Sequence, residues 1–412
     1  MNEKVVITGI GVLTAIGIGK ENFWNALMAG KSGIKRISRF DTTDYPTKIA
    51  AEIRDFNPAR FMGAEMVRKC TRSNQLGLAA TRMALEDAGL DLSGVDMKRV
   101  GVSVGVGGEI IGMVDERSAI ARGKYMEPKA LPDLPNLLPN LMADEFSVSG
   151  PTLCVATACS AGNQAVGQAR DLIRLGKADI MITGGTEAPI LPLAVASFCA
   201  LRIMSRRNDE PERSSRPFDL ERDGFVLGEG AGIMILETES RARARGARIY
   251  AEVAGFGATC DAYHMTIPSP DKVQISRAMT LALNDGGVAP DEVDYINAHG
   301  TSTEANDIGE TRAIKSIFGE RAYQIPVSSI KSMIGHTIGA AGAIELIATI
   351  LAIERDIVPP TINQEKPDPN CDLDYVPNKP RAHRVGVALS NSFGFGGNNT
   401  SILVRKLNED RK

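Results

Sequence analysis

Residues 87–96 read DAGLDLSGVD and residues 285–294 read DGGVAPDEVD, so the two stretches share D-x-G at the start and V-D at the end. Each follows an amphipathic helical pattern, over residues 74–88 and 274–285, and each precedes an apolar run. The match is short, but the shared helix–turn–strand context favours an internal duplication over chance. We therefore predict two similar halves, packed into one body.

Short β-branched runs that end in glycine recur along the chain: VVITGIGVLT (residues 5–14), VGVSVGVGGEI (100–110) and DIMITGGTEA (179–188). Such runs are typical of buried strands that enter a tight turn, and helical patterns lie between them. This alternation predicts a layered α/β architecture. Because the charged pattern before residue 249 changes to a strand pattern with no flexible linker, we expect the halves to be residues 1–251 and 252–412.

The composition excludes several classes of protein. A chain of 412 residues with 43% hydrophobic residues and a net charge of −3 has no basic excess for nucleic acid. We expect no membrane insertion, because no apolar run approaches roughly 18 residues, and no signal peptide, because glycine interrupts the first apolar run. The six cysteines form neither a disulfide framework nor paired metal ligands, so we expect a reduced, cytoplasmic protein without a metal.

Cys159 lies among small residues in VATACSAGN, residues 155–163, directly before a helical pattern. Small neighbours leave room for a ligand to approach the sulfur, and the N-terminus of a helix can lower the pKa of a thiol. A cysteine that merely packs in a small-residue turn is the alternative.

Two of the four histidines follow predicted strands. His299 lies in YINAHGTSTEAND and His336 in SSIKSMIGHTIGAAGAIE, which also holds Lys331 and Glu345. Strand ends in α/β sheets are where ligands bind, so we expect both histidines near Cys159. Each histidine could instead be structural, and the lysine and glutamate could form a simple ion pair.

A glycine-rich loop with one aromatic residue follows the last apolar strands. It holds Gly394, Phe395 and Gly396 in SNSFGFGGNNTSILV, residues 390–404. It contains neither the G-K-[ST] motif nor the G-x-G-x-x-G spacing of phosphate-binding loops. Backbone N–H groups that stabilise an oxyanion, covered by the phenylalanine, are a better explanation.

Four stretches in register together resemble the β-ketoacyl synthase family: TACSAG, NAHGTST, KSMIGH and NSFGFGG. The similarity extends over essentially the whole chain, and it is greatest to the branch that elongates fatty acyl chains. It implies the thiolase fold, in which two βαβαβαββ halves form five layers, α-β-α-β-α, normally as a homodimer. The predicted duplication agrees with that fold.

The resemblance also implies a role for each matching position. Cys159 corresponds to the nucleophile that takes the acyl chain, His299 and His336 to the pair that promotes malonyl decarboxylation, and Lys331 to the lysine that supports them. Phe395 corresponds to the gate, and its N–H group with that of Cys159 to the oxyanion hole. Supporting positions are Glu345, Asp307, Thr301 and Thr303.

The implied reaction suits these residue types. A thiol exchanges readily with thioesters, and two neutral imidazoles can stabilise the enolate that decarboxylation leaves. The enolate attacks the acyl thioester and gives 3-oxoacyl-[acyl-carrier protein] and carbon dioxide. A thiolase would need a second reactive cysteine, and Cys371 in DPNCDLDYV is not in a glycine-rich turn.

The chain departs from the family in the predicted acyl pocket, to which we assign Gly107, Gly108, Glu109 and Phe198. Residues 105–112 read GVGGEIIG, where the family often has an isoleucine between glycines. A smaller residue could deepen the pocket, and a carboxylate could favour a polar chain or pair at an interface. Asn398 also replaces the threonine that the family commonly has in the gating loop.

Acyl carrier protein is the expected partner, and its phosphopantetheine arm is the only cofactor implied. Because that protein is acidic, we expect a basic docking surface. The candidates are Arg68, Lys69, Arg72, Arg202, Arg206 and Arg207.

Three other functions stay open. A ketosynthase of polyketide or other secondary metabolism has the same chemistry with a different chain, and GVGGEIIG is the reason to consider it. A non-catalytic subunit of a ketosynthase heterodimer would usually lack the cysteine. A cysteine hydrolase would leave the second histidine and the lysine without a role.

Overall fold

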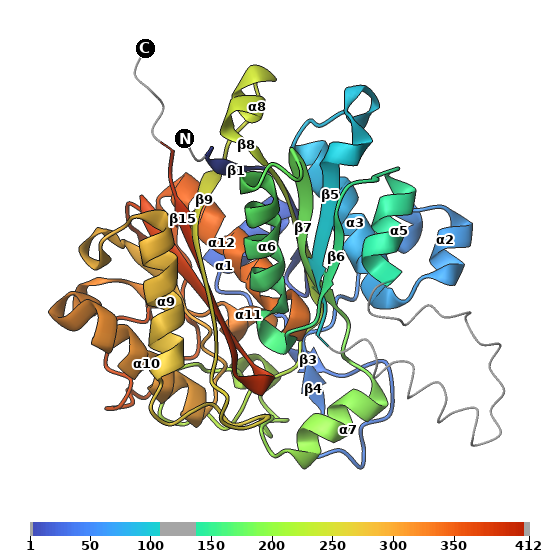
Figure 1. Cartoon of the computed structure of the whole chain (residues 1–412). Helices are drawn as coiled ribbons and strands as arrows, with labels where there is room; N and C mark the ends of the chain where they lie inside the picture. Colours follow the sequence, from blue (N-terminus) through green and yellow to red (C-terminus); the bar gives the residue numbers. More distant parts are fainter. Residues whose placement is uncertain (1–2, 108–136, 408–412) are drawn as a thin grey trace.

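The protein is described by a computed structural model that covers residues 3–107 and 137–407 (Figure 1). The strands of its main sheet lie side by side in the order β11 (Val327–Ser328), β10 (Tyr295–Asn297), β14 (Val387–Gly394), β15 (Asn398–Arg405), β9 (Ala251–Cys260), β1 (Val5–Thr14), β8 (Gly230–Thr238), β7 (Ile180–Glu187), β5 (Val100–Gly105) and β6 (Thr152–Val155). The remaining short strands are β2 (Gly17–Ile18), which pairs with β1, β3 (Lys35–Arg36) with β4 (Ile49–Ala50), and β12 (Ile357–Val358) with β13 (Arg381–Ala382).

The helices of the described residues are α1 (Lys20–Met28), α2 (Ala64–Lys69), α3 (Arg72–Asp87), α5 (Leu137–Glu145), α6 (Ala161–Arg174), α7 (Pro192–Ala200), α8 (Glu239–Ala244), α9 (Val273–Gly286), α10 (Glu304–Phe318), α11 (Lys331–Ile334) and α12 (Ala341–Arg355).

The sheet has the same strand order from either end. β6-β5-β7-β8-β1 forms one half and β11-β10-β14-β15-β9 the other, and they meet where β1 pairs with β9, antiparallel, at Val6↔Glu252 and Ile7↔Ala251. In each half the third strand is parallel to the second and antiparallel to the fourth. With α3, α5 and α6 in the first half and α9, α10 and α12 in the second, each half has the chain order βαβαβαββ. The predicted duplication is therefore confirmed.

The two echoed stretches occupy equivalent positions. In the first half α3 is followed by Gly89, at φ 55°, a 3₁₀ turn at Leu92–Gly94 and then β5. In the second half α9 is followed by Gly287, at φ 62°, a 3₁₀ turn at Pro290–Glu292 and then β10. Only glycine adopts these left-handed angles readily, so the shared glycine marks the same helix end in both copies.

Glycine also brings each outer helix onto the first strand of its half. A Cβ atom at Gly11 of β1 would lie 1.9 Å from the carbonyl oxygen of Ala80 in α3. At Gly257 of β9 it would lie 2.0 Å from that of Ala278 in α9. The same close contact therefore recurs in both halves.

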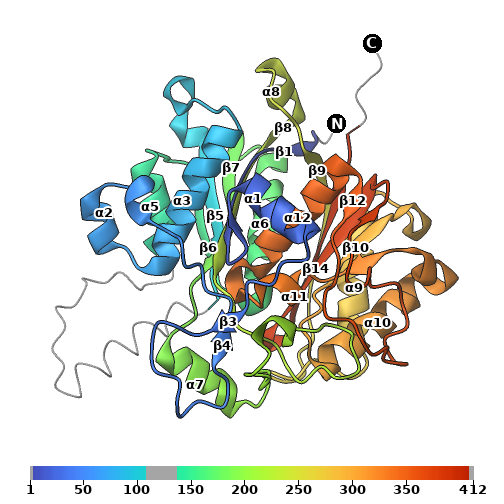
Figure 2. The same ribbon diagram turned by 180° about the vertical axis from the view of Figure 1, so that it is seen from behind.

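The elements form five layers, which follow one another across Figure 1 from α9 to α3. α9, with α10 beside it, covers the outer face of the second half, and α3 covers that of the first. α6 and α12 lie between the halves and contact strands of both, and Figure 2 shows α12 from behind. Ala341–Ile353 of α12 are all buried, because sheet and helices surround this helix. The predicted α-β-α-β-α arrangement is confirmed.

The boundary between the halves stays a prediction at residues 251 and 252, and β9 begins at Ala251. Among the described residues, no helix has both the length and the apolar character that crossing a bilayer requires.

Candidate active site

The two central helices begin beside each other, each after a short 3₁₀ turn. The turn before α6 is Ala158–Ser160 and the turn before α12 is Ile338–Ala340. Ala158 has φ 51° and Ile338 has φ 45°, although both carry a Cβ atom. Positive φ angles are uncommon for any residue except glycine and are strained for a β-branched residue such as Ile338. They are found where neighbouring contacts impose them. The turn before α6 contains Cys159, and the turn before α12 closely follows His336.

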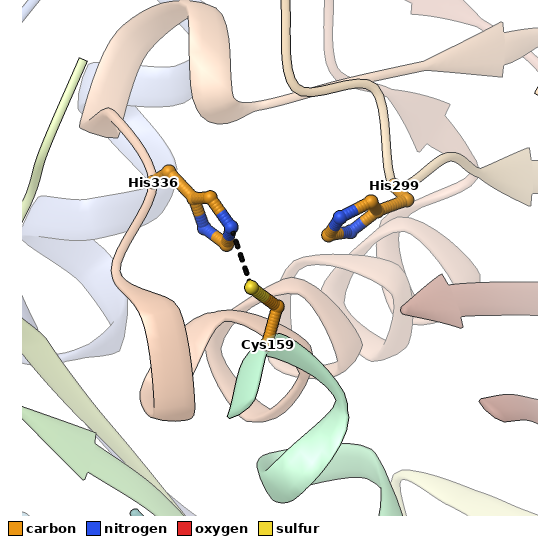
Figure 3. A group of neighbouring side chains, drawn as sticks. All are labelled: Cys159, His299 and His336. Atoms are coloured by element: carbon orange, nitrogen blue, oxygen red, sulfur yellow. Dashed lines mark hydrogen bonds between the residues drawn. The ribbon is translucent and has the colours of Figure 1, made fainter. Parts of the chain in front are cut away.

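Three predicted residues meet at this place (Figure 3). Cys159 comes from the first half, and His299, after β10, and His336, after α11, come from the second. Nε2 of His336 lies 3.0 Å from Sγ of Cys159, and ligand atoms of all three residues lie within 4.8 Å of one another. The imidazole rings are 5.4 Å apart, centroid to centroid, at 81°. All three side chains are buried, so the site is complete only when both halves are folded.

A backbone contact determines which nitrogen of His336 carries the proton. The N–H group of Ile338 donates to Nδ1 of His336 at 3.3 Å. Nδ1 is therefore the acceptor, and the proton of the neutral ring is on Nε2. The Nε2–H group points at the sulfur of Cys159, where it can donate to a thiolate or to a substrate oxygen.

Both histidines are neutral at physiological pH. Burial lowers the pKa of His299 and of His336 well below the usual value, and the nearby Lys331 ammonium lowers both further. Neutral imidazoles are the hydrogen-bond donors that an enolate requires.

Burial also raises the pKa of the Cys159 thiol to about 12. The backbone N–H groups at the start of the helix lower this pKa, as expected, but desolvation of the thiolate outweighs the favourable contacts. Those contacts are the charge of Lys331 and the backbone N–H groups of Phe395 and of Cys159 itself. The resting nucleophile is a neutral thiol, and the same N–H groups are available to an oxyanion.

Lys331 is buried and contacts the backbone of His299. Its Nζ donates to the carbonyl oxygen of His299 at 2.6 Å and pairs with Oε1 of Glu345 at 2.5 Å. Burial raises the pKa of Glu345 to about 7, although Lys331 opposes this. The pair is therefore both an ion pair and a support for the backbone of His299.

Sequence analysis missed Glu310, a buried residue of α10. Its carboxylate accepts the N–H groups of His299, at 2.8 Å, and of Gly300, at 2.9 Å. Burial raises its pKa to about 7. A single glutamate in a helix has no local signal for such a role, because the groups that it binds belong to a different segment.

Of the other supporting residues, Thr301 and Thr303 line the cavity and Asp307 does not. The hydroxyl oxygens of Thr301 and Thr303 are 2.8 Å apart, and both residues line it. Asp307 is buried, and its carboxylate accepts the N–H group of Phe218 at 2.9 Å and pairs with Arg222 at 3.5 Å. Asp307 therefore holds a neighbouring loop and does not line the cavity.

The site opens into a largely apolar cavity of about 260 Å³. Phe395 of the glycine-rich loop after β14 is half-buried there, and its ring centroid is 6.4 Å from that of Phe198. Gly394 and Gly107 line the cavity, whereas Gly396 does not and donates its N–H group to the carbonyl of Met265 at 2.8 Å. Gly108 and Glu109 lie outside the described residues.

The six candidate docking residues fall into two groups: side chains that are exposed, and arginines that bind other parts of the fold. Arg68, Arg202 and Arg206 are exposed. Lys69 is exposed but pairs with Glu65 of the same helix.

Two of the arginines instead bind within the fold. Arg72 binds the buried carboxylate of Glu229 and the carbonyl of Ile53. Arg207 donates to the carbonyl of Glu221 at 2.9 Å.

Comparison with known proteins agrees with this geometry. The profile of the beta-ketoacyl synthase N-terminal domain matches residues 2–242, and that of the C-terminal domain matches residues 250–365. The chain belongs to the β-ketoacyl synthase family. In this family the site is that of a condensing acyltransferase, of the type of 3-oxoacyl-[acyl-carrier-protein] synthase 2.

Relatives of this ketoacyl synthase cover nearly its whole length. It is 46% identical to 3-oxoacyl-[acyl-carrier-protein] synthase 2 of Synechocystis over 408 residues, 98% of each chain. It is 44% identical to the tetracenomycin polyketide synthase ketoacyl synthase alpha subunit of Streptomyces glaucescens, over 99% of this chain and 98% of that one.

Among solved structures, this ketoacyl synthase matches the ishigamide ketosynthase/chain length factor with a TM-score of 0.91 and 38% identity. It also matches a type II polyketide ketosynthase in complex with its acyl carrier protein, with a TM-score of 0.90 and 37% identity. Each match covers 99% of this chain and 100% of the other.

Proposed function

We propose that the protein elongates acyl chains on acyl carrier protein in fatty-acid synthesis. The Cys159 thiol attacks the acyl thioester, and its proton passes to the released pantetheine thiol. Malonyl-[acyl-carrier protein] then loses carbon dioxide, and its enolate displaces Cys159 from the acyl group. The products are 3-oxoacyl-[acyl-carrier protein], carbon dioxide and the Cys159 thiolate, which takes up one proton from solvent to restore the thiol, so atoms and charges balance.

The observation that carries this proposal is the Nε2–H group of His336 against the Cys159 sulfur, with a second neutral imidazole in the same cavity. A hydrolase needs one imidazole that accepts a proton from water. Here Nδ1 of His336 is already an acceptor for backbone, and its Nε2 is a donor. Donors rather than a base favour stabilisation of an enolate.

A ketosynthase of polyketide biosynthesis is the second candidate. The 44% identity to the tetracenomycin alpha subunit favours it, since that value is close to the identity with the fatty-acid enzyme of Synechocystis. The chemistry is the same, so the accepted acyl chain distinguishes the two.

Intact-protein mass spectrometry tests both candidates. The protein is incubated with a panel of acyl-[acyl-carrier protein] thioesters, and malonyl-[acyl-carrier protein] is then added. We expect a fatty acyl adduct that is absent in Cys159→Ala, followed by a 3-oxoacyl product two carbons longer. An adduct that only hydrolyses would contradict the condensing function, and adducts confined to polyketide chains would favour the second candidate.

The docking surface that we propose for the carrier protein consists of Arg68, Arg202 and Arg206, the exposed candidates that form no ion pair within the described part of the chain. Arg202→Glu and Arg206→Glu should raise KM for the carrier protein and leave alkylation of Cys159 unchanged. Arg243→Glu is the matched control, because α8 projects from the opposite end of the molecule to α7 (Figure 1). Equal KM values for all three variants would refute this surface.

We also propose a homodimer through β6. This strand ends the sheet, and Thr152 and Leu153 on it are exposed. The equivalent strand β11 is covered, since the N–H group of Val327 donates to the carbonyl of Asp374 at 2.8 Å. Among the described residues no further strand pairs with the outer edge of β6, and such an edge is a pairing surface.

Light scattering measures the oligomer directly. Two chains of 44.0 kDa are expected for the wild type, and one for Thr152→Pro, which removes an N–H donor from the outer edge of β6. A monomeric wild type would refute the dimer. We propose a cytoplasmic location, where the carrier protein and its thioesters would be available.

A further inference from the structure

The start of α12 is a second copy of the start of α6. Residues 337–342 read TIGAAG and residues 157–162 read TACSAG, and both form a 3₁₀ turn that leads into a central helix. Gly339 therefore occupies the position of Cys159. By the same symmetry, the end of β7 corresponds to the end of β14, which leads into the Phe395 loop.

The two copies use the backbone N–H group at this position differently. In the first copy, the N–H group of Cys159 contacts its own sulfur, and Cys159 lines the cavity. In the second, the N–H group of Gly339 donates to Oε2 of Glu187 at 3.2 Å, and that of Gly107 donates to the same oxygen at 2.5 Å. Glu187 is the last residue of β7, is buried and lines the cavity. A carboxylate of the protein therefore occupies the place that an oxyanion takes in the catalytic copy.

The Glu187 carboxylate connects segments that are packed too closely to admit an additional Cβ atom. A Cβ atom at Gly107 would lie 2.5 Å from Cγ2 of Ile338, and one at Gly339 would lie 2.3 Å from the nitrogen of Gly107. The end of β5, the end of β7 and the start of α12 thus meet at Glu187. Movement of one of these segments must move the others.

The contact of Glu187 with Gly339 affects His336 through Ile338, which precedes Gly339 and donates to the imidazole. Ile338 has the disfavoured φ of 45°, and in this conformation its N–H group donates to Nδ1 of His336. The neighbouring backbone bonds are those of His336 N–H to Val226 and of Ala340 N–H to Thr337. Of these three bonds, the one from Gly339 is made to a side chain, and the same oxygen of Glu187 also accepts the N–H group of Gly107, so this bond joins two segments.

We propose that Glu187 is a positioning residue, whose carboxylate holds the strained turn at the start of α12 and so keeps the Ile338 N–H group on Nδ1 of His336. It thereby maintains the Nε2–H tautomer that the condensation requires. The inference rests on the proposed function, because its consequence is a slower decarboxylating condensation. Acylation of Cys159 depends less on this tautomer.

The test is a double-mutant cycle between Glu187 and Ile338. Glu187→Ala should lower the turnover of malonyl-[acyl-carrier protein] by about 10- to 100-fold, with a smaller loss in the rate of Cys159 acylation. Glu187→Gln should lose only about threefold, since an amide oxygen can accept the same N–H groups. Ile338→Gly removes the strain, so Glu187→Ala should lose less than about threefold in that background.

Three results would overturn the proposal: wild-type turnover in Glu187→Ala, the same loss from Glu187→Ala with and without Ile338→Gly, or equal losses in acylation and condensation. If Glu187→Ala does not fold, Glu187→Gln provides the same cycle, and its loss must disappear beside Ile338→Gly. A wild-type protein without an acyl adduct or 3-oxoacyl product would instead refute the proposed function. The two failures are therefore distinguishable.

Discussion

Replacing Glu310 by glutamine should make the protein less sensitive to alkaline pH. Burial raises the pKa of this carboxyl from its ordinary 4.5 to about 7 in the folded state. A raised carboxyl pKa means that the folded state favours the protonated form. The stabilisation is therefore fully present below pH 4.5 and is lost as the pH rises through 7.

The expected magnitude follows from the same two values. At 1.36 kcal/mol per pKa unit, the rise from 4.5 to about 7 corresponds to about 3 kcal/mol, of which about 2.5 kcal/mol is lost between pH 5 and 8.5. An unfolding entropy of about 2.1 cal/mol/K per residue over 412 residues gives roughly 0.9 kcal/mol/K. The difference in Tm between Glu310→Gln and the wild type should thus change by about 3 °C between these pH values, in favour of the variant at pH 8.5.

Scanning calorimetry at pH 5 and pH 8.5 measures this difference directly. Glu304→Gln is the matched control, because Glu304 lies on the same helix but is exposed. Its difference from the wild type should be the same at both pH values. If the difference for Glu310→Gln is also the same at both, the buried carboxyl does not titrate in this range.

The other predictions concern the thiol, the donor set and the packing. Because burial raises the pKa of Cys159 to about 12, alkylation by iodoacetamide should accelerate about tenfold per pH unit from pH 7 to 10; a plateau near pH 8 would contradict this. The three ligand atoms within 4.8 Å should bind added Zn²⁺ and block acylation, and a chelator should restore it; acylation unaffected by zinc would refute this. Gly257→Ala places a Cβ atom 2.0 Å from the carbonyl oxygen of Ala278, so urea unfolding should show a loss of about 1–3 kcal/mol, and an unchanged midpoint would mean that α9 shifts freely.

The duplication was predictable because it rests on local patterns. Glycine after the helix in DAGLD and in DGGVA determines a left-handed helix end wherever it occurs. The approach of Cys159, His299 and His336 was also predictable, since each follows a strand or precedes a helix of one layered sheet.

The remaining features depend on contacts between distant segments. Arg72 looked like a surface cation, but its partner Glu229 is 157 residues away along the chain. Glu310 and Glu187 bind backbone groups, whose positions have no sequence signal. The net pKa of Cys159 has no sequence signal for the same reason, because burial depends on everything that packs around the sulfur and not on its own helix.

The complete burial of Ala341–Ile353 in α12 has a consequence during synthesis. This helix covers strands of the first half, yet the ribosome makes it about 100 residues after β9 begins. At roughly 5–20 residues per second, β7 and β8 of the emerging first half wait about 5–20 s without α12, although α6 already lies on the same face. During that interval the nascent chain is a substrate for chaperones, and slower translation after residue 260 should increase aggregation of the new protein.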